Sequence, residues 1–546
     1  MSSDNRSVQK ICLLFLSIFC LASCFRSIPH SISTPQVEPY KQPDGIEGGE
    51  LIKALNGYLI ILRKGIIYSA KKIKKDIKTV SSIKTDNYGL APSFPRRRLF
   101  ILRERVVVVS WSAPLSAIGV GLFKLDHGGK LIHLSTKYLS GCQFYTNGKS
   151  IVSRIIDDKL IFYVPTHIRG YTDKNNPTCQ AKLSASDPAP RPSMIGHWQK
   201  GSIIKWKNIV ELGNYNKKLA GSDSIHTIYY CNLLKDNLSC SSKSVRGGFA
   251  RDFYVSSSAA YLWTLGSDCL KKHQTYGATV YRFPISSSSK EDVTIWKTFG
   301  TPVNKFSTRE INGKLYSVVQ KVSCSLTLEK TIHTNTGNGK IYLVDKPIRD
   351  FATKNKASVS YDSKSYSLPS LTGVVFYRNR FVGSKYVYGY HKQYQDSNKT
   401  INIVDIDTKK VKLLLLNHTV DSIARIDNNS FIVQGKSYDT IPGHYNYSLV
   451  DSPIQISSVS IENNPVVRSR YVYKPATNSE THTVCSSIRQ IDKIKGFTNK
   501  IISLPMQQTS GEFSHLKYGT AKILFMSIDA QLQISEIGVI QAHEQK

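Results

Sequence analysis

The stretch TREINGKLYSVV, residues 308–319, decides the fold. A short run containing Ile311 leads into Asn312-Gly313, and an apolar run follows the dipeptide. Asn and Gly tolerate the positive φ angles of a tight turn between two antiparallel strands. The same layout recurs in SRIIDDKLIFYV (153–164) and ARIDNNSFIV (424–433), where Asp157-Asp158 and Asp427-Asn428 supply the turn. The three copies predict a hairpin that the chain uses repeatedly.

Short β-branched and aromatic runs continue outward from these hairpins. They begin near residue 97, at RLFIL and VVVVSW, and recur to KILFMSI near the C-terminus. Turn-forming Gly, Asn, Asp and Ser separate them, which is typical of strands. An all-β region of this length is too large for one sandwich, and a ring of four-stranded blades protects its sheet edges. The sequence therefore predicts an all-β β-propeller over residues 97–546, with about seven blades and eight as the alternative.

A family resemblance supports this interpretation. Residues 277–320 resemble bacterial secreted proteins that carry a C-terminal β-propeller domain, distantly related to WD-repeat propellers. That family has an NQFS segment followed by an acidic residue, a turn and a strand; here NKFSTREINGKLYSVV fills the place, with Lys305 where the family has Gln. Residues 95–110 and 401–414 are similar to other strands of the family. The resemblance implies the fold and export, and it supplies no catalytic residue to transfer.

The N-terminal stretch ICLLFLSIFCLASCF, residues 11–25, indicates the compartment. It is shorter than the roughly 20 apolar residues that span a bilayer, and it suits the core of a signal peptide. Leu21-Ala22-Ser23-Cys24 resembles a bacterial lipobox, in which the Cys24 thiol accepts a lipid and acyl chains such as palmitate hold the protein at a membrane. We expect residues 1–23 to be a lipoprotein signal peptide. Phe25, where an Asp would favour retention in the inner membrane, favours the outer membrane if the cell is Gram-negative.

Two other interpretations of this segment stay open. One is an ordinary cleaved signal peptide. The other is the uncleaved anchor of a type II viral attachment glycoprotein, itself a propeller, in which N-glycans would occupy sequons. The sequons of the chain begin at Asn237, Asn398, Asn417 and Asn446.

The cysteines agree with export. Seven lie beyond residue 24, and an oxidising compartment would pair most of them. The spacing predicts a Cys231–Cys240 disulfide across a hairpin. Sequence order alone suggests Cys142–Cys179 and Cys269–Cys324. No Cys/His spacing suggests zinc.

The chain is strongly basic. It has 73 Lys and Arg against 39 Asp and Glu, a formal net charge of +34, which favours polyanionic partners. Lysine-rich composition without a function is the alternative. Basic residues concentrate between residues 63 and 105, where apolar residues at steps of three and four predict a basic helical or linker segment over residues 50–96. The candidate contacts to an anionic surface are Lys71, Lys72, Lys74, Lys75, Lys78, Arg96, Arg97 and Arg98.

Residues 24–49 are expected to form a flexible tether. After Cys24 and Phe25 the segment contains several prolines and glycines and no apolar period, and it reads RSIPHSISTPQVEPYKQPDGIEGG. The domain order is therefore signal peptide, tether, basic segment and propeller.

Catalytic motifs are missing from the sequence. There is no nucleophile elbow, no HExxH, no P-loop and no EF-hand loop. The aromatic run YVYGYHKQY around His391 and the acid pairs Asp157/Asp158 and Asp405/Asp407 are more simply explained as strand and turn residues. We expect no cofactor, no metal and no catalytic residue.

The sequence favours an exported, lipid-anchored propeller that binds or scaffolds at the bacterial cell envelope and faces the periplasm or the exterior. Its partners would be the membrane, through the N-terminal lipid, and an acidic envelope polymer or protein, with no nucleic acid. The enzyme alternative is a propeller that acts on an anionic glycan, which would need acids, histidines or a metal to converge at one end of the tunnel.

Overall fold

The computed structural model describes residues 46–542 with interruptions. The predicted signal peptide, Cys24 and most of the predicted tether therefore lie outside the described residues. The longer interruptions are residues 91–97, 141–152, 168–208, 211–223, 266–277, 286–291, 327–331, 354–364, 371–375, 392–398, 437–452, 474–479, 485–488, 492–498 and 511–520.

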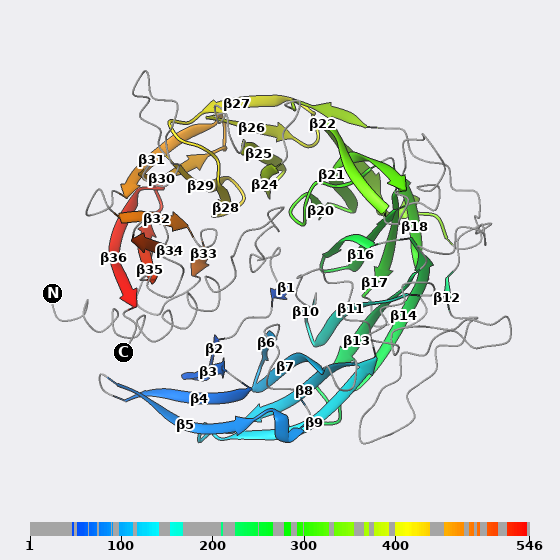
Figure 1. The fold of residues 1–546 in the computed structure, drawn as a ribbon, viewed down its shortest axis with the longest axis vertical. Helices are drawn as coiled ribbons and strands as arrows, with labels where there is room; N and C mark the ends of the chain where they lie inside the picture. Colours follow the sequence, from blue (N-terminus) through cyan, green and yellow to red (C-terminus); the bar gives the residue numbers. More distant parts are fainter. Residues whose placement is uncertain are drawn as a thin grey trace. The chain divides into compact units, whose positions relative to one another are not determined.

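The chain divides into two compact units, one holding residues 39–337 and 344–365 and the other residues 338–343 and 366–546. The first unit contains four sheets whose strands are almost all antiparallel (Figure 1). Two of them are simple four-stranded meanders: β2 (Ile52–Leu55), β3 (Tyr58–Arg63), β4 (Ile66–Ile73) and β5 (Asp76–Lys84), then β6 (Arg98–Leu102), β7 (Arg105–Ser112), β8 (Ala117–Leu125) and β9 (Leu131–Ser140).

The third sheet of this unit is larger because two short strands join it. Its order is β1-β10-β11-β13-β14-β12, and only the β12–β14 pairing is parallel. Its strands are β1 (Ile46–Gly48), β10 (Ser153–Ile156), β11 (Lys159–His167), β12 (Ile209–Val210), β13 (Ser224–Asn232) and β14 (Ser239–Gly247). The fourth sheet is again a meander, of β15 (Ala250–Val255), β16 (Ala259–Leu265), β17 (Ala278–Pro284) and β18 (Thr294–Thr298).

A fifth sheet follows along the chain. It consists of β19 (Thr301–Pro302), β20 (Thr308–Ile311), β21 (Lys314–Leu326), β22 (Ile332–Pro347) and β23 (Tyr366–Leu368). Two short 3-10 helices, η1 (Asp86–Tyr88) and η7 (Ile348–Asp350), are the helical turns of the described part of the first unit.

The second unit adds three sheets. The sixth and seventh are meanders: β24 (Phe376–Val382), β25 (Lys385–His391), β26 (Thr400–Asp405) and β27 (Val411–Leu415), then β28 (Ser422–Arg425), β29 (Ser430–Lys436), β30 (Ile454–Ser460) and β31 (Val466–Tyr473). The eighth consists of β32 (Glu480–Val484), β33 (Arg489–Ile491), β34 (Lys500–Ser510), β35 (Ala521–Ile528) and β36 (Ile534–Ala542). The described residues thus form eight sheets, which matches the alternative of eight blades.

Tight turns recur between consecutive strands of these sheets. Asn312 and Gly313 have φ angles of 48° and 73°, and the register Ile311↔Lys314 leaves them as a two-residue loop, as the sequence predicts. Asp157, with φ of 51°, turns β10 into β11 in the same way. Asn56-Gly57 and Gly383-Ser384 connect β2 to β3 and β24 to β25. The hairpin predicted from residues 308–319 therefore recurs in several sheets.

The hydrophobic core lies between consecutive sheets. One buried cluster joins Phe100 and Val107 of the second sheet to Leu160 and Phe162 of the third. Others join the first sheet to the second, the third to the fourth, the sixth to the seventh and the seventh to the eighth. Strand β7 of the second sheet packs against the first sheet through Val106 and Val108 and against the third sheet through Val107 and Val109, which explains why the run Val106–Val109 is fully buried at every position.

The basic helix expected within residues 50–96 is wrong, because residues 52–84 of this range form the first sheet. Asn56 and Gly57 have φ angles of 48° and 80°, and Gly65 has φ of 81°. These left-handed positions turn the chain where a helix would have to continue. Strand β1 also begins at Ile46, inside the range expected to be a flexible tether.

Candidate functional site

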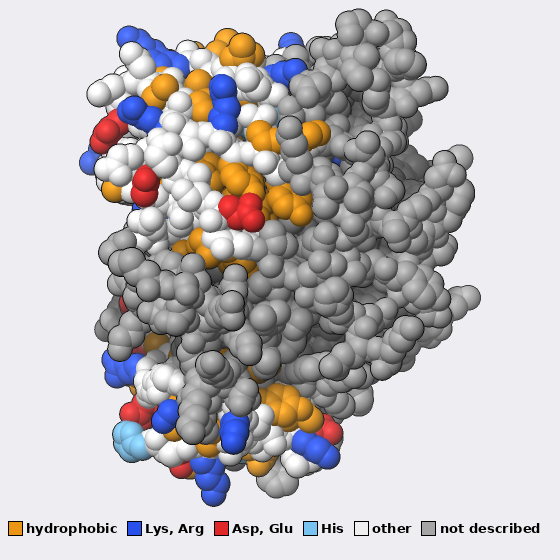
Figure 2. Space-filling model, turned by 90° about the vertical axis from the view of Figure 1, so that its left-hand side faces the viewer, with side chains coloured by type: hydrophobic (Ala, Val, Ile, Leu, Met, Phe, Trp, Pro, Cys, Tyr) orange, Lys and Arg blue, Asp and Glu red, His pale blue; other side chains and the backbone are white. Residues whose placement is uncertain are grey.

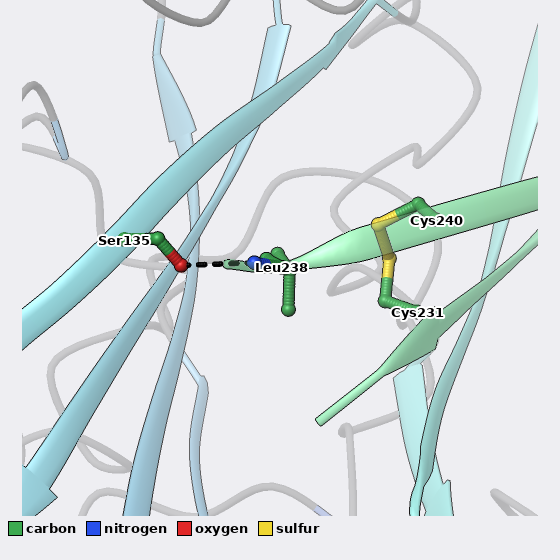
Figure 3. The surroundings of a disulfide bond; sticks show 4 residues. All are labelled: Ser135, Cys231, Leu238 and Cys240. Carbon is green, nitrogen blue, oxygen red and sulfur yellow. Dashed lines mark hydrogen bonds between the residues drawn. A yellow bond between two sulfur atoms is a disulfide. The ribbon is translucent and has the colours of Figure 1, made fainter. Parts of the chain in front are cut away.

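The structure contains the Cys231–Cys240 disulfide that the spacing predicts (Figure 3). The two cysteines are register partners in β13 and β14, and the loop of residues 233–238 joins the strands. Cys231 is fully buried, in the cluster between the second and third sheets. The cysteines of the other suggested pairs, apart from the backbone of Cys324, lie outside the described residues.

The loop that the disulfide closes contacts the neighbouring sheet. The Arg105 guanidinium donates to the Leu234 carbonyl at 2.7 Å and to the Asp236 carboxylate at 2.8 Å. The Ser135 hydroxyl donates to the Asp236 carbonyl at 2.7 Å and accepts from the Leu238 amide at 3.1 Å. Figure 3 shows the Ser135 hydroxyl and the Leu238 amide beside the disulfide. We call residues 231–240 the latch, because they fix the third sheet to the second.

A carboxylate cluster connects the fourth and fifth sheets. Glu310, in β20, accepts hydrogen bonds from Ser256 at 2.5 Å, from Ser258 at 2.7 and 2.8 Å and from Tyr261 at 2.7 Å. Its backbone amide donates to the Tyr254 hydroxyl at 3.1 Å. The serines lie at the β15–β16 turn, so one side chain of the fifth sheet holds the first hairpin of the fourth.

The NKFS segment places Glu310, the acidic residue that follows it. The Asn304 side chain accepts from the Phe306 amide at 2.9 Å, and the Ser307 amide donates to the Asn304 carbonyl at 3.0 Å. These bonds form a turn that leads directly into β20. Lys305 lies with its ammonium 4.7 Å from the centre of the Phe306 ring. The family-typical residues therefore shape a turn and a structural contact.

The Glu310 cluster has the chemistry of a structural anchor. Burial first, and the Glu310 carboxylate second, raise the pKa of the Tyr261 hydroxyl well above its usual value, so the hydroxyl stays a donor. Arg282, the register partner of Tyr261, supplies a positive charge nearby. Three hydroxyl donors thus satisfy one carboxylate without histidine or a second acid.

Two buried histidines make hydrogen bonds inside their sheets. His418 donates from Nδ1 to the Thr419 carbonyl at 2.7 Å and accepts at Nε2 from Ser457 at 2.8 Å. Burial lowers the pKa of His418 to about 4, so the ring is neutral at pH 7. His226 likewise uses both ring nitrogens: Nδ1 is hydrogen-bonded to the Tyr163 hydroxyl and Nε2 to the Gly248 carbonyl.

The acids and aromatics weighed in the sequence occupy strand and turn positions. Asp157 and Asp158 form the β10–β11 turn. Asp405 accepts from Lys385 and from two amides of its own turn; burial alone would raise its pKa, but these hydrogen bonds outweigh burial and hold the pKa at about 2. In the aromatic run, Tyr386 and Tyr388 are fully buried. The side chain of His391 lies outside the described residues.

The predicted anionic-surface contacts whose side chains the structure describes are Lys71, Lys78 and Arg98, and they lie in the first two sheets. Lys71 and Lys78 are exposed register partners in β4 and β5, and the Lys71 ammonium lies 5.3 Å from the centre of the Tyr58 ring. Arg98 begins β6 and is partly buried. The side chains of Lys72, Lys74, Lys75, Arg96 and Arg97 lie outside the described residues.

The outer strands carry a feature that the sequence reading missed. Leu413 and Leu415, in β27, are 69% and 68% exposed. The other exposed large hydrophobic residues of the described chain have exposed fractions of at most 43%. They lie among Lys410 and Lys412, both exposed. Figure 2 shows hydrophobic side chains beside lysine and arginine side chains on the described surface. The run VKLLL resembles an ordinary core strand, so composition alone could not reveal this exposure.

Within the described residues, no group of three or more His, Cys, Asp and Glu is placed to hold a metal ion. The same residues include no helix with the length and apolar character needed to cross a bilayer.

Comparison with known proteins identifies the fold. A family model described as "Beta propeller domain" matches residues 41–358, more than half of the chain. The chain belongs to the beta propeller domain family. No curated protein matches the sequence.

Two solved structures share a distant likeness with this family member. One is a chain of an S. cerevisiae dbp5 structure with nup159, gle1, IP6 and ADP, with 7% identity, a TM-score of 0.24, and coverage of 76% of this chain and 86% of that one. Another is an oligogalacturonate lyase in complex with manganese, with 8% identity, a TM-score of 0.24, and coverage of 80% and 79%. Both TM-scores are too low to carry an argument about function.

Proposed function

We propose that this β-propeller is an exported, lipid-anchored binding or scaffolding module of the bacterial cell envelope. Its place at the membrane would come from acylation of Cys24, and its recognition surface from the outer strands of its sheets. The partner would be an acidic envelope component, since the chain has a formal net charge of +34.

The Cys231–Cys240 disulfide is the observation that carries the proposal. Disulfides of this kind form and persist in oxidising compartments, so the bond supports export. The lipobox-like residues Leu21–Cys24 supply the anchor that export makes available.

The hydrogen-bonded state of the acids supports binding over catalysis. Glu310 is satisfied by three hydroxyl donors, and Asp405 by Lys385 and backbone amides. An acid or base catalyst needs a group free to exchange a proton with a substrate. These acids instead hold strands and turns together.

Metabolic labelling with palmitate tests the proposed anchor. The parent chain, expressed in a bacterium, should incorporate label and fractionate with membranes, whereas Cys24→Ala should lose both. Cys20→Ala is the matched control, because it changes a cysteine of the same apolar segment outside the lipobox position; it should keep the label. Label that persists in Cys24→Ala, or a parent chain found free in the cytosol, would contradict the proposal.

A further inference from the structure

The exposed leucines of β27 are not required by the packing of their sheet. Leu414 packs against the core cluster between the sixth and seventh sheets. Side chains alternate along a strand, so Leu413 and Leu415 lie on the other face, opposite Asn402 and Thr400 in the register. β27 is also the last strand of its sheet. Two leucines thus stay in water at an edge where polar residues would be expected.

Cations lie next to these leucines along the chain. Lys410 precedes β27, and Lys412 is on the strand face opposite Leu413 and Leu415, so exposed lysines and leucines flank the same sheet edge from its two sides. The Lys412 ammonium donates to the Asn464 side chain at 2.8 Å, which connects β27 to the turn before β31. β31 presents two more exposed cations, Arg468 and Arg470, beside the exposed Val466 and Val472.

Few acids oppose this charge. Asp405 is paired with Lys385, and the exposed Asp407 and Glu462 lie in turns beside β27 and β31. We call Lys410, Lys412, Leu413 and Leu415 the β27 patch. It combines exposed apolar side chains with a surplus of positive charge.

We propose that the β27 patch docks on an anionic phospholipid bilayer. The leucine side chains would enter the boundary between headgroups and acyl chains, and the lysines would lie against the phosphates. This inference rests on the proposed function, because a chain that never meets a membrane gains nothing from such a patch. It adds a second contact that orients the propeller on the membrane to which Cys24 would attach it.

The size of the patch favours a bilayer over a protein partner. A stable protein interface takes roughly 800 Å² from each partner, with a well-packed apolar centre. Two leucine side chains cover far less, but a bilayer accepts single side chains wherever they reach its surface. The acyl chains at Cys24 would hold the chain at the membrane without orienting the folded body, and basic and apolar side chains on one surface element are a common additional membrane contact.

Tryptophan substitution gives a local readout that the N-terminal anchor does not mask. The full chain carrying Leu413→Trp is bound to vesicles of phosphatidylglycerol and phosphatidylcholine, with and without brominated lipid, and its emission is compared with that of the parent. Ile132→Trp is the matched control, because Ile132 is an exposed apolar residue, 41% accessible, of another outer strand, β9.

The added emission of Leu413→Trp should shift to the blue and be quenched at least about twofold more than that of Ile132→Trp. Adding Lys410→Glu and Lys412→Glu to the Leu413→Trp chain should abolish the difference in quenching from Ile132→Trp. Vesicles of phosphatidylcholine alone should abolish it as well. Both lysine substitutions are at exposed positions, so thermal unfolding should not change.

Three results would overturn the inference. The first is equal quenching of Leu413→Trp and Ile132→Trp, and the second is quenching of Leu413→Trp that does not depend on vesicle charge. The third is a Leu413→Ser/Leu415→Ser chain whose membrane orientation is the same as that of the parent. If the chain sediments with vesicles through its acyl chains but Leu413→Trp is not quenched, the docking inference fails and the proposed function stands. A chain that does not sediment with vesicles contradicts both.

Discussion

At the residue scale, single polar side chains hold the sheets together through partners distant in sequence. Glu310 reaches Ser256, 54 residues away, and Arg105 reaches Asp236, 131 residues away. No spacing rule in one sequence connects such positions. The family-like NKFS segment marks the neighbourhood of Glu310, but only the folded chain shows which hydroxyls its carboxylate binds.

Removing the Glu310 carboxylate should lower stability. Glu310→Ala leaves the hydroxyls of Ser256, Ser258 and Tyr261 without their acceptor, and hydrogen bonds to a charged group contribute about 1.5–3 kcal/mol each. We expect a loss of about 2–3 kcal/mol in the free energy of unfolding, measured by calorimetry or denaturant titration. Glu462→Ala, at an exposed turn, is the control and should change it by less than about 0.5 kcal/mol. Equal effects of the two substitutions would show that the cluster is not an anchor.

The buried His418 predicts a specific pH dependence. Its pKa is about 4 in the folded chain and near 6.5 when unfolded, so the unfolded chain binds the proton more tightly. The contribution of His418 to the free energy of unfolding should therefore be fully present above about pH 7 and fall by about 3 kcal/mol as the pH drops to 4. The contribution of Asp405, whose pKa is about 2 in the folded chain against an ordinary 3.8, begins to fall near the acid end of this window and is lost mainly below about pH 4.

Thermal unfolding between pH 7 and 4 measures this dependence. His418→Gln, whose side chain does not titrate, should be less stable at pH 7 and show a flatter slope over the window. A variant with the same slope as the parent would exclude His418 as the cause.

At the scale of elements, sequence patterns predicted the hairpins that have strong turn chemistry. The turns at residues 157–158 and 312–313 lie where expected. The sequence predicts a helix in place of the first sheet because the apolar residues of its strands fall by chance at steps of three and four. Asn56-Gly57 was the missed signal, since this dipeptide between apolar runs favours a hairpin. The exposure of β27 was not predictable, because it depends on which face of the strand meets the next sheet.

Glycine at the Asn312-Gly313 turn should be needed for its backbone conformation alone. Gly313 has φ of 73° and no atom within 4 Å of an added Cβ, so Gly313→Ala strains only the backbone. We expect a loss of about 1 kcal/mol in unfolding free energy. Gly128→Ala, in an exposed turn without a positive φ, is the control and should have little effect. An unchanged Gly313→Ala would argue against the turn assigned here.

The latch should depend on its disulfide. Breaking it with Cys231→Ala and Cys240→Ala releases a loop of about ten residues, which costs about 2–3 kcal/mol on the chain-entropy model. Denaturant unfolding with and without a thiol reductant measures this, and the double variant should match the reduced parent. A parent chain that reductant leaves unchanged would contradict a stabilising role.

At the scale of the whole molecule, eight sheets follow one another along the chain, with cores between consecutive sheets in each unit. This arrangement and the family match establish a propeller, whose sheets present outer strands to possible partners. The exported location is the central claim that gives these surfaces a partner. It depends on Cys24, which precedes the described residues.

The mass of the N-terminal peptide tests that claim most directly. Protein purified from bacterial membranes and digested with protease should yield a peptide that begins at Cys24 and carries a diacylglyceryl group. A peptide that begins at an intact Met1, or an unmodified peptide cleaved elsewhere, would contradict the lipid anchor.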